Sequence, residues 1–224
     1  PLTSIITYVD LLKDESISPA ERQSYIDTLA QKSQRLKELI NDLFEVSKAS
    51  SNTMVFYPSA MNIVSLIKQV ENEWQDAYAE AGLALHNRFA AENLPVYLDG
   101  EKTSRIFENL FNNAWKYSLA GTRVFVEAEA AEGEVRVSIK NVSREALDFD
   151  DELITERFVR GDSPRNTEGS GLGLAIVKGF TENQGGRFLI ETEGDLFRAI
   201  VTFPLWVASQ EPAAEENGEA VEGS

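Results

Sequence analysis

The sequence has no cysteine and one histidine, His86, among its 224 residues. These shortages exclude disulfide bonds, thiolate metal centres and any site built from several histidines. No apolar run approaches the roughly 20 residues that a membrane-spanning helix needs. Basic residues are also scarce, with 21 Lys and Arg against 37 Asp and Glu, for a formal net charge of −16. This balance predicts no nucleic-acid partner, because nucleic-acid binding depends on a basic face.

The first 48 residues predict a hairpin of two helices. Apolar residues spaced by three and four positions favour a helix over 2–13, and Ser18-Pro19-Ala20-Glu21 is a capping sequence that begins a second helix. In that second helix an apolar seam repeats about every seven residues, at Ile26, Leu29, Leu36, Ile40 and Leu43. We expect two copies of the hairpin to bury their seams in a four-helix bundle. Packing of the hairpin on its own chain is the alternative.

The remainder of the chain mixes helices and strands. After a connector at 49–60, helices are predicted over 61–82, 101–117 and 171–183. Strands are predicted at 83–89, 96–98, 123–130, 134–140, 188–191 and 197–204, with a turn at Glu132-Gly133 between the third and the fourth. Residues 141–170 are polar and broken by glycine and proline, which is typical of a functional loop or lid, with one short helical piece at 150–158. The acidic stretch 206–224 predicts a disordered tail.

The predicted fold class is therefore α+β. A helical hairpin, half of a dimeric bundle, is followed at 61–205 by an α/β sandwich with a mixed sheet and helices on one face.

Four polar residues share one stripe of the predicted helix 101–117. Asn109, Asn113, Lys116 and Tyr117 are separated by four, three and one positions. Amide oxygens are neutral ligands that suit Mg²⁺, which also takes phosphate oxygens, and a lysine can meet phosphate as a point charge. The stripe indicates a site for a metal-bound phosphate compound. A solvated helix face with an accidental cluster of asparagines is the alternative.

Two further motifs favour phosphate binding. Residues 169–177 read GSGLGLAIV, in which glycines allow close approach of a ligand and the N–H groups of a new helix attract anions. A plain tight turn is the alternative. Residues 155–160 read TERFVR, where Phe158 could pack over a nucleotide and Arg160 could reach phosphate. Ordinary packing and a surface charge are the alternative for that segment.

In this order the motifs resemble the sensor histidine kinases of two-component systems. The ATP-binding domain of those proteins belongs to the superfamily of gyrase, Hsp90, histidine kinases and MutL. The opening residues PLTSI also resemble the end of the family's phosphoacceptor motif, H-E-L-R-T-P-L-T-S-I, so the resemblance runs from Pro1 to about Pro204. It implies a dimerisation and phosphoacceptor hairpin at 1–48 and a catalytic ATP-binding domain at 61–205.

The resemblance also implies roles for individual residues. Mg²⁺ would be held by Asn113 with Asn109 beside it, phosphates by Lys116 and Arg160, and the nucleotide would be lined by Tyr117. The remaining residues of the implied ATP site are Asn141, Phe158, Gly169, Ser170, Gly171, Leu172 and Gly173. The implied reaction transfers the γ-phosphate of ATP to a histidine, for relay to an aspartate of a response regulator. A homodimer through 1–48 and a cytoplasmic location, with the parent protein anchored to the membrane, are implied as well.

The sequence departs from the family pattern in its histidine. The family's phosphoacceptor would lie five residues before Pro1, so we expect segments upstream and no self-phosphorylation by this chain, and we expect its dimer to be weakened. His86 lies in a predicted strand away from the hairpin and is interpreted as a structural or surface residue.

A second departure lies in the family's D-x-G-x-G motif, which reads Asn141-Val142-Ser143-Arg144-Glu145 here. The family aspartate accepts a hydrogen bond from the adenine amino group, and asparagine keeps a carbonyl oxygen for that role. Loss of both glycines stiffens the start of the predicted lid. A nucleotide-binding pseudokinase or scaffold is therefore the alternative function. An ATPase of the gyrase or MutL type is disfavoured by the hairpin that precedes the domain.

Overall fold

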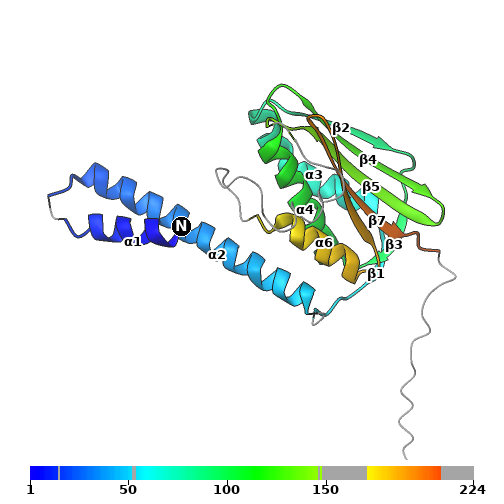
Figure 1. Ribbon diagram of the computed structural model, residues 1–224, viewed down its shortest axis with the longest axis horizontal. Helices are drawn as coiled ribbons and strands as arrows, with labels where there is room; N and C mark the ends of the chain where they lie inside the picture. Colours follow the sequence, from blue (N-terminus) through cyan, green and yellow to red (C-terminus); the bar gives the residue numbers. More distant parts are fainter. Residues whose placement is uncertain (15, 52–53, 146, 148–170, 208–224) are drawn as a thin grey trace, which may run out of the picture.

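The computed structural model describes residues 1–14, 16–51, 54–145, 147 and 171–207. Helices α1 (Leu2–Leu11) and α2 (Pro19–Ser50) form the predicted hairpin, which extends away from the rest of the molecule (Figure 1). The predicted capping sequence is confirmed, because the Ser18 hydroxyl accepts the Glu21 N–H at 3.2 Å and the Glu21 carboxylate accepts the Ser18 N–H at 3.0 Å. Among the described residues, no helix combines the length and apolar character that crossing a membrane requires.

A five-stranded mixed sheet follows, with strand order β2-β4-β5-β7-β6. Strand β2 (Ala84–Phe89) pairs in parallel with β4 (Arg123–Ala131). The remaining three pairs of this sheet are antiparallel: β4 with β5 (Glu134–Val142), β5 with β7 (Leu196–Pro204), and β7 with β6 (Arg187–Glu193). The predicted turn between β4 and β5 is confirmed at Glu132 and Gly133, whose φ angles are 55° and 80°.

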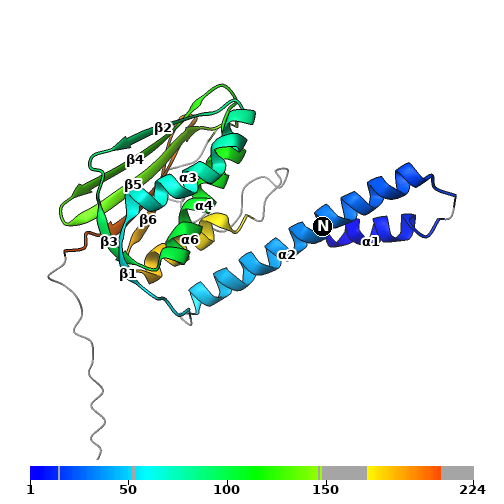
Figure 2. The ribbon, with the colours of Figure 1, turned by 180° about the vertical axis from the view of Figure 1, so that it is seen from behind.

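Helices α3 (Ile63–Glu80), α4 (Gly100–Tyr117) and α6 (Gly173–Asn183) cover one face of this sheet, as Figures 1 and 2 show from opposite sides. The core lies between the two layers. Because side chains alternate along a strand, Val135, Val137 and Ile139 of β5 all enter it, and Asn141 has the same parity. The predicted fold class is thus confirmed, and one amide lies in the otherwise apolar helix-facing row of β5.

The prediction was wrong between residues 59 and 62. Strand β1 (Ser59–Asn62) lies where a connector and the start of a helix were predicted, and it pairs antiparallel with β3 (Pro95–Leu98). The helix begins only at Ile63 because Asn62 caps it, accepting the Val64 N–H at 3.1 Å. Apolar spacing detects a helix face but does not reveal a preceding strand whose partner lies more than thirty residues away.

Several other predicted boundaries move by one or two residues. Helix α1 ends at Leu11, and β5 continues to Val142, so the first two residues of the predicted lid belong to a strand. Helix α6 starts at Gly173 rather than Gly171, because a φ of +70° at Gly171 is incompatible with a right-handed helix. His86 lies in β2 as predicted, with its ring centroid 5.7 Å from that of Phe125. The predicted helical piece at 150–158, the lid residues 148–170 and the tail 208–224 lie outside the described residues.

Candidate functional site

Helix α4 is fixed firmly against α3. The Tyr78 hydroxyl donates to the Phe111 carbonyl at 2.7 Å, and the Trp115 indole N–H donates to the Ala77 carbonyl at 3.0 Å. Burial raises the pKa of Tyr78 above its ordinary value, so the phenol stays neutral and remains a donor. With one face of α4 held in this way, the residues on its other face occupy defined positions.

The four predicted polar residues lie together on that helix. Asn109, Asn113, Lys116 and Tyr117 are all half-buried, whereas Asn112, next to Asn113 in sequence, is exposed. The Lys116 ammonium lies 5.8 Å from the centroid of the Tyr117 ring. The arrangement gives a row of two amides, an ammonium and a phenol along one side of α4.

Asn109 meets the start of α6. Its Nδ2 donates to the Arg105 carbonyl at 2.8 Å, which leaves Oδ1 as the acceptor that faces Gly173. A Cβ atom at position 173 would lie 2.9 Å from that oxygen, so glycine leaves room for the Asn109 amide in this orientation against the start of α6. The polar row of α4 and the predicted glycine motif are therefore adjacent in space.

The N-terminus of α6 is suited to anions. Leu172 occupies the N-cap and offers no side-chain acceptor, so no side-chain hydrogen bond caps this end of the 11-residue helix among the residues described. The free N–H groups of a first turn, with the positive end of the helix dipole, favour phosphate. Gly171, with its left-handed φ of +70°, directs the chain into this turn.

Asn141 is an unsatisfied amide beside the other end of α4. Its side chain is 2% exposed, and within the described part of the chain neither Oδ1 nor Nδ2 has a hydrogen-bond partner. The neighbouring backbone fixes its place, because the Arg144 N–H donates to the Tyr117 carbonyl and the Leu119 N–H donates to the Val142 carbonyl, both at 2.9 Å. A buried amide without partners costs about 1–3 kcal/mol. An arriving group with both a donor and an acceptor would recover that cost.

The structure thus brings most of the predicted site residues into one region. Helix α4 carries Asn109, Asn113, Lys116 and Tyr117. The chain enters α6 through Gly171, Leu172 and Gly173, and Asn141 is the last residue but one of β5. Phe158, Arg160, Gly169 and Ser170 lie outside the described residues. Within the described ranges, no group of three or more His, Cys, Asp or Glu could hold a metal ion. Mg²⁺ bound through amide oxygens and phosphate does not need such a group.

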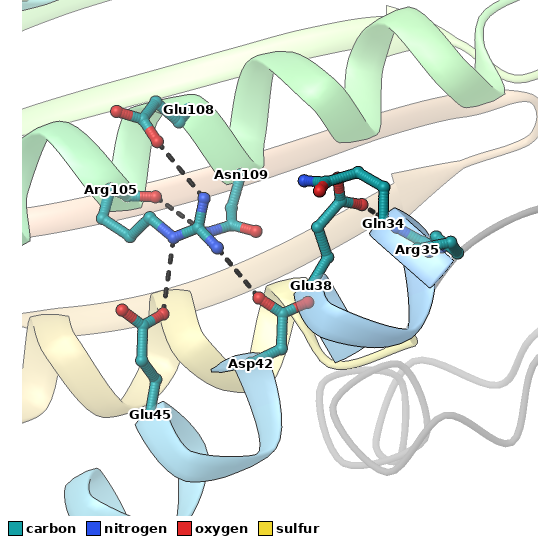
Figure 3. A network of polar contacts seen from close by, with 8 residues as sticks. All are labelled: Gln34, Arg35, Glu38, Asp42, Glu45, Arg105, Glu108 and Asn109. Atoms are coloured by element: carbon teal, nitrogen blue, oxygen red, sulfur yellow. Dashed lines mark hydrogen bonds and ion pairs between the residues drawn. The ribbon is translucent and has the colours of Figure 1, made fainter. Parts of the chain in front are cut away.

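Sequence reasoning missed a charged cluster that joins α2 to α4 (Figure 3). The Arg105 guanidinium lies 2.8 Å from Asp42, 3.4 Å from Glu45 and 3.3 Å from Glu108. Burial alone would lower the pKa of Arg105, but the charges of Glu45, Glu108 and Asp42 together raise it. Asp42 is buried although it lies on the hairpin, at the point where Arg105 of α4 pairs with it.

A second contact joins the hairpin to α6. The Asn183 amide donates to the Ala49 carbonyl at 3.1 Å, and a Cβ atom on Gly179 would lie 2.7 Å from that of Ala49. The end of α2 therefore packs closely on α6 while its preceding turn pairs with α4. Neither contact could be read from local spacing, because each joins residues more than sixty positions apart.

We expect Arg105→Ala to loosen this hairpin contact. Without the guanidinium, three carboxylates face one another, so protection from hydrogen exchange over 42–49 should fall, and adding Asp42→Ala should restore part of it. The coupling should be about 1 kcal/mol or less, because Arg105 is 37% exposed, and it should shrink in high salt. Arg35→Ala is the matched control, since Arg35 pairs with Glu38 within α2 alone. Equal exchange in the Arg105 and Arg35 variants would show that the cluster does not hold the hairpin.

Comparison with known protein families agrees with this geometry. Residues 1–52 match the model of the His Kinase A (phospho-acceptor) domain, and residues 98–207 match that of the histidine kinase-, DNA gyrase B- and HSP90-like ATPases. The fold and the site thus define an ATPase domain of that superfamily behind a phospho-acceptor hairpin. The chain belongs to the two-component sensor histidine kinases.

One relative is similar in sequence, and two solved structures share the fold. The chain is 30% identical over 207 residues to the sensor protein VanSC of Enterococcus gallinarum. The aligned region covers 91% of this chain and 57% of the relative. The solved histidine kinase AdeS of Acinetobacter baumannii superposes with a TM-score of 0.74 at 18% identity, covering 92% of this chain and 95% of that one. The histidine kinase ThkA, solved in complex with the response regulator protein TrrA, gives a TM-score of 0.71 at 22% identity and covers 92% and 58%.

Proposed function

We propose that this chain binds ATP with Mg²⁺ and transfers the γ-phosphate to a histidine of the phosphoacceptor motif. The observation that carries the proposal is the meeting of Asn109 with Gly173, which brings the amides of α4 to the start of α6. Oxygen ligands for a metal and N–H donors for phosphate converge at that point. The family to which the chain belongs supports ATP as the phosphate compound.

Different residues would bind different parts of the nucleotide. Asn113 and Asn109 would hold Mg²⁺ through their side-chain oxygens, and Lys116 would meet the phosphates. Tyr117 and Asn141, at the far end of α4, would take the base. Mg²⁺ supplies charge neutralisation during phosphoryl transfer, and the protein contributes by positioning the reacting groups and excluding water.

The proposal extends to domains and partners. Residues 1–48 form the dimerisation and phosphoacceptor hairpin, 49–60 the connector, 61–205 the catalytic domain and 206–224 an acidic tail. A response-regulator receiver domain would take the phosphate from the histidine, which is supported by the solved ThkA complex with TrrA. A second copy of the hairpin would complete the bundle.

Phosphoryl transfer itself is the decisive test. The chain is incubated with Mg²⁺ and γ-labelled ATP together with an extended hairpin that carries a histidine five residues before Pro1. We expect acid-labile, alkali-stable label on the hairpin, and none when EDTA removes the metal. A pseudokinase or scaffold, the alternative that the altered motif at 141–145 favours, would bind nucleotide without labelling the hairpin. That outcome would overturn the kinase assignment.

A further inference from the structure

The side chain of Asn141 offers both hydrogen-bonding polarities. Its amide carries one acceptor and one donor group, and a half-turn about the Cβ–Cγ bond exchanges their places. Neither atom has a partner among the described residues, so none of the described groups selects one orientation. The amide can therefore adapt to the group that enters.

A purine presents one of two complementary patterns to such an amide. Adenine donates from its 6-amino group and accepts at N1. Hypoxanthine and guanine accept at O6 and donate from N1–H. An asparagine in one orientation makes two hydrogen bonds with the first pattern, and in the other orientation makes two with the second. A carboxylate only accepts, so it pairs with the 6-amino group but faces O6 with an oxygen.

We propose that Asn141 forms two hydrogen bonds with the 6-substituent and N1 of the purine, whether the 6-substituent is a donor or an acceptor. The site would then accept 6-oxopurine nucleoside triphosphates, GTP among them, as well as ATP. This inference rests on the proposed nucleotide function. Its basis is the burial of an unpaired amide in the helix-facing row of β5, where the three preceding members are Val135, Val137 and Ile139. An apolar side chain would continue that row without cost, whereas the unpaired amide is costly until a ligand pairs it.

The position of Asn141 is also right for reading a base. It lies beside the segment that follows Tyr117, which is pinned by the Arg144 and Leu119 backbone N–H groups. Asn109 and Gly173, which suit metal and phosphate, lie two turns of α4 earlier. A turn of α-helix rises about 5.4 Å, so this separation of roughly 11 Å fits the span from phosphate to base.

The test measures the affinities of ATP, ITP and GTP, each with Mg²⁺, by competition against a fluorescent ATP analogue on the full chain. ITP is the sharpest probe because it has O6 and N1–H but no 2-amino group. We expect ITP and GTP to bind within about tenfold of ATP. If GTP alone binds more weakly, its 2-amino group meets a steric limit in the site, and normal binding of ITP still supports base recognition by Asn141.

Variants isolate the amide. Asn141→Asp should retain ATP while weakening ITP roughly 10- to 100-fold relative to it, because the carboxylate cannot donate to O6. Asn141→Ala should weaken the binding of both ATP and ITP and leave the ratio of their affinities near one. Asn112→Asp, which adds the same charge at an exposed position of α4, should leave the ratio unchanged. Circular dichroism checks that each variant is folded.

The outcomes separate two failures. If no triphosphate binds, the proposed function fails. If the wild-type chain binds ATP but takes ITP at least 100-fold more weakly, or if Asn141→Asp leaves the ratio of ITP to ATP unchanged, the reading of the base by Asn141 is overturned while the proposed function stands.

Discussion

Asn113→Ala is expected to abolish Mg²⁺-dependent binding of ATP. Asn113 lies one turn beyond Asn109 on the polar row of α4, and its amide oxygen is the proposed metal ligand. Mg²⁺ is bound by few protein groups and shares phosphate oxygens, so the loss of one ligand removes both metal and phosphate affinity. Titration with a fluorescent ATP analogue should show at least a 100-fold loss of affinity, roughly 2.7 kcal/mol.

The adjacent asparagine supplies the control for this prediction. Asn112 is exposed, whereas Asn113 is half-buried, so Asn112→Ala should bind ATP normally. Far-UV circular dichroism should be the same for both variants, because neither side chain enters the core. Undiminished affinity in a folded Asn113→Ala chain would refute the assignment of the metal ligand.

Local spacing was sufficient to predict the polar row of α4. The separations between Asn109, Asn113 and Lys116 are those of a helix face, and helix geometry alone places them together. The turn at Glu132 and Gly133 was equally local, since the residues that need positive φ lie between two alternating strands. Such features depend on a few neighbouring residues, which is why the sequence reveals them.

Contacts between distant segments could not be predicted in this way. Arg105 and Asp42 are ordinary surface residues by composition, and they become partners only where α2 passes α4 in the fold. Strand β1 was missed for the same reason, because its partner β3 is brought to it by the helix between them. For Asn141 the sequence marked an unusual residue, but only the structure shows that its amide is buried and has no partner among the residues described.

The hairpin keeps much of its apolar seam exposed to solvent in a single chain. On α2, Ile26 is 44% exposed, Ile40 45% and Leu43 60%, and the neighbouring Phe44 is 63% exposed. Docking of the end of α2 on α6 leaves this side of the hairpin uncovered, so the alternative that the chain buries its own seam accounts for only part of it. A contiguous exposed apolar surface is typical of an interface, and a second copy offers the same surface.

Leu43→Glu is therefore expected to convert a dimer into a monomer. In a two-fold symmetric bundle each substitution occurs twice, and burying a leucine side chain contributes about 1.5–3 kcal/mol. The two losses together correspond to a dimer dissociation constant raised roughly 100-fold or more, before the cost of burying the new charge is added. Sedimentation velocity between low and high micromolar concentration measures this change.

Gln31→Glu adds the same charge at an exposed position outside the seam and should remain dimeric. The dimer interface would have to lie elsewhere if Leu43→Glu sedimented like the wild-type chain, and a wild-type monomer at high micromolar concentration would contradict dimerisation through 1–48.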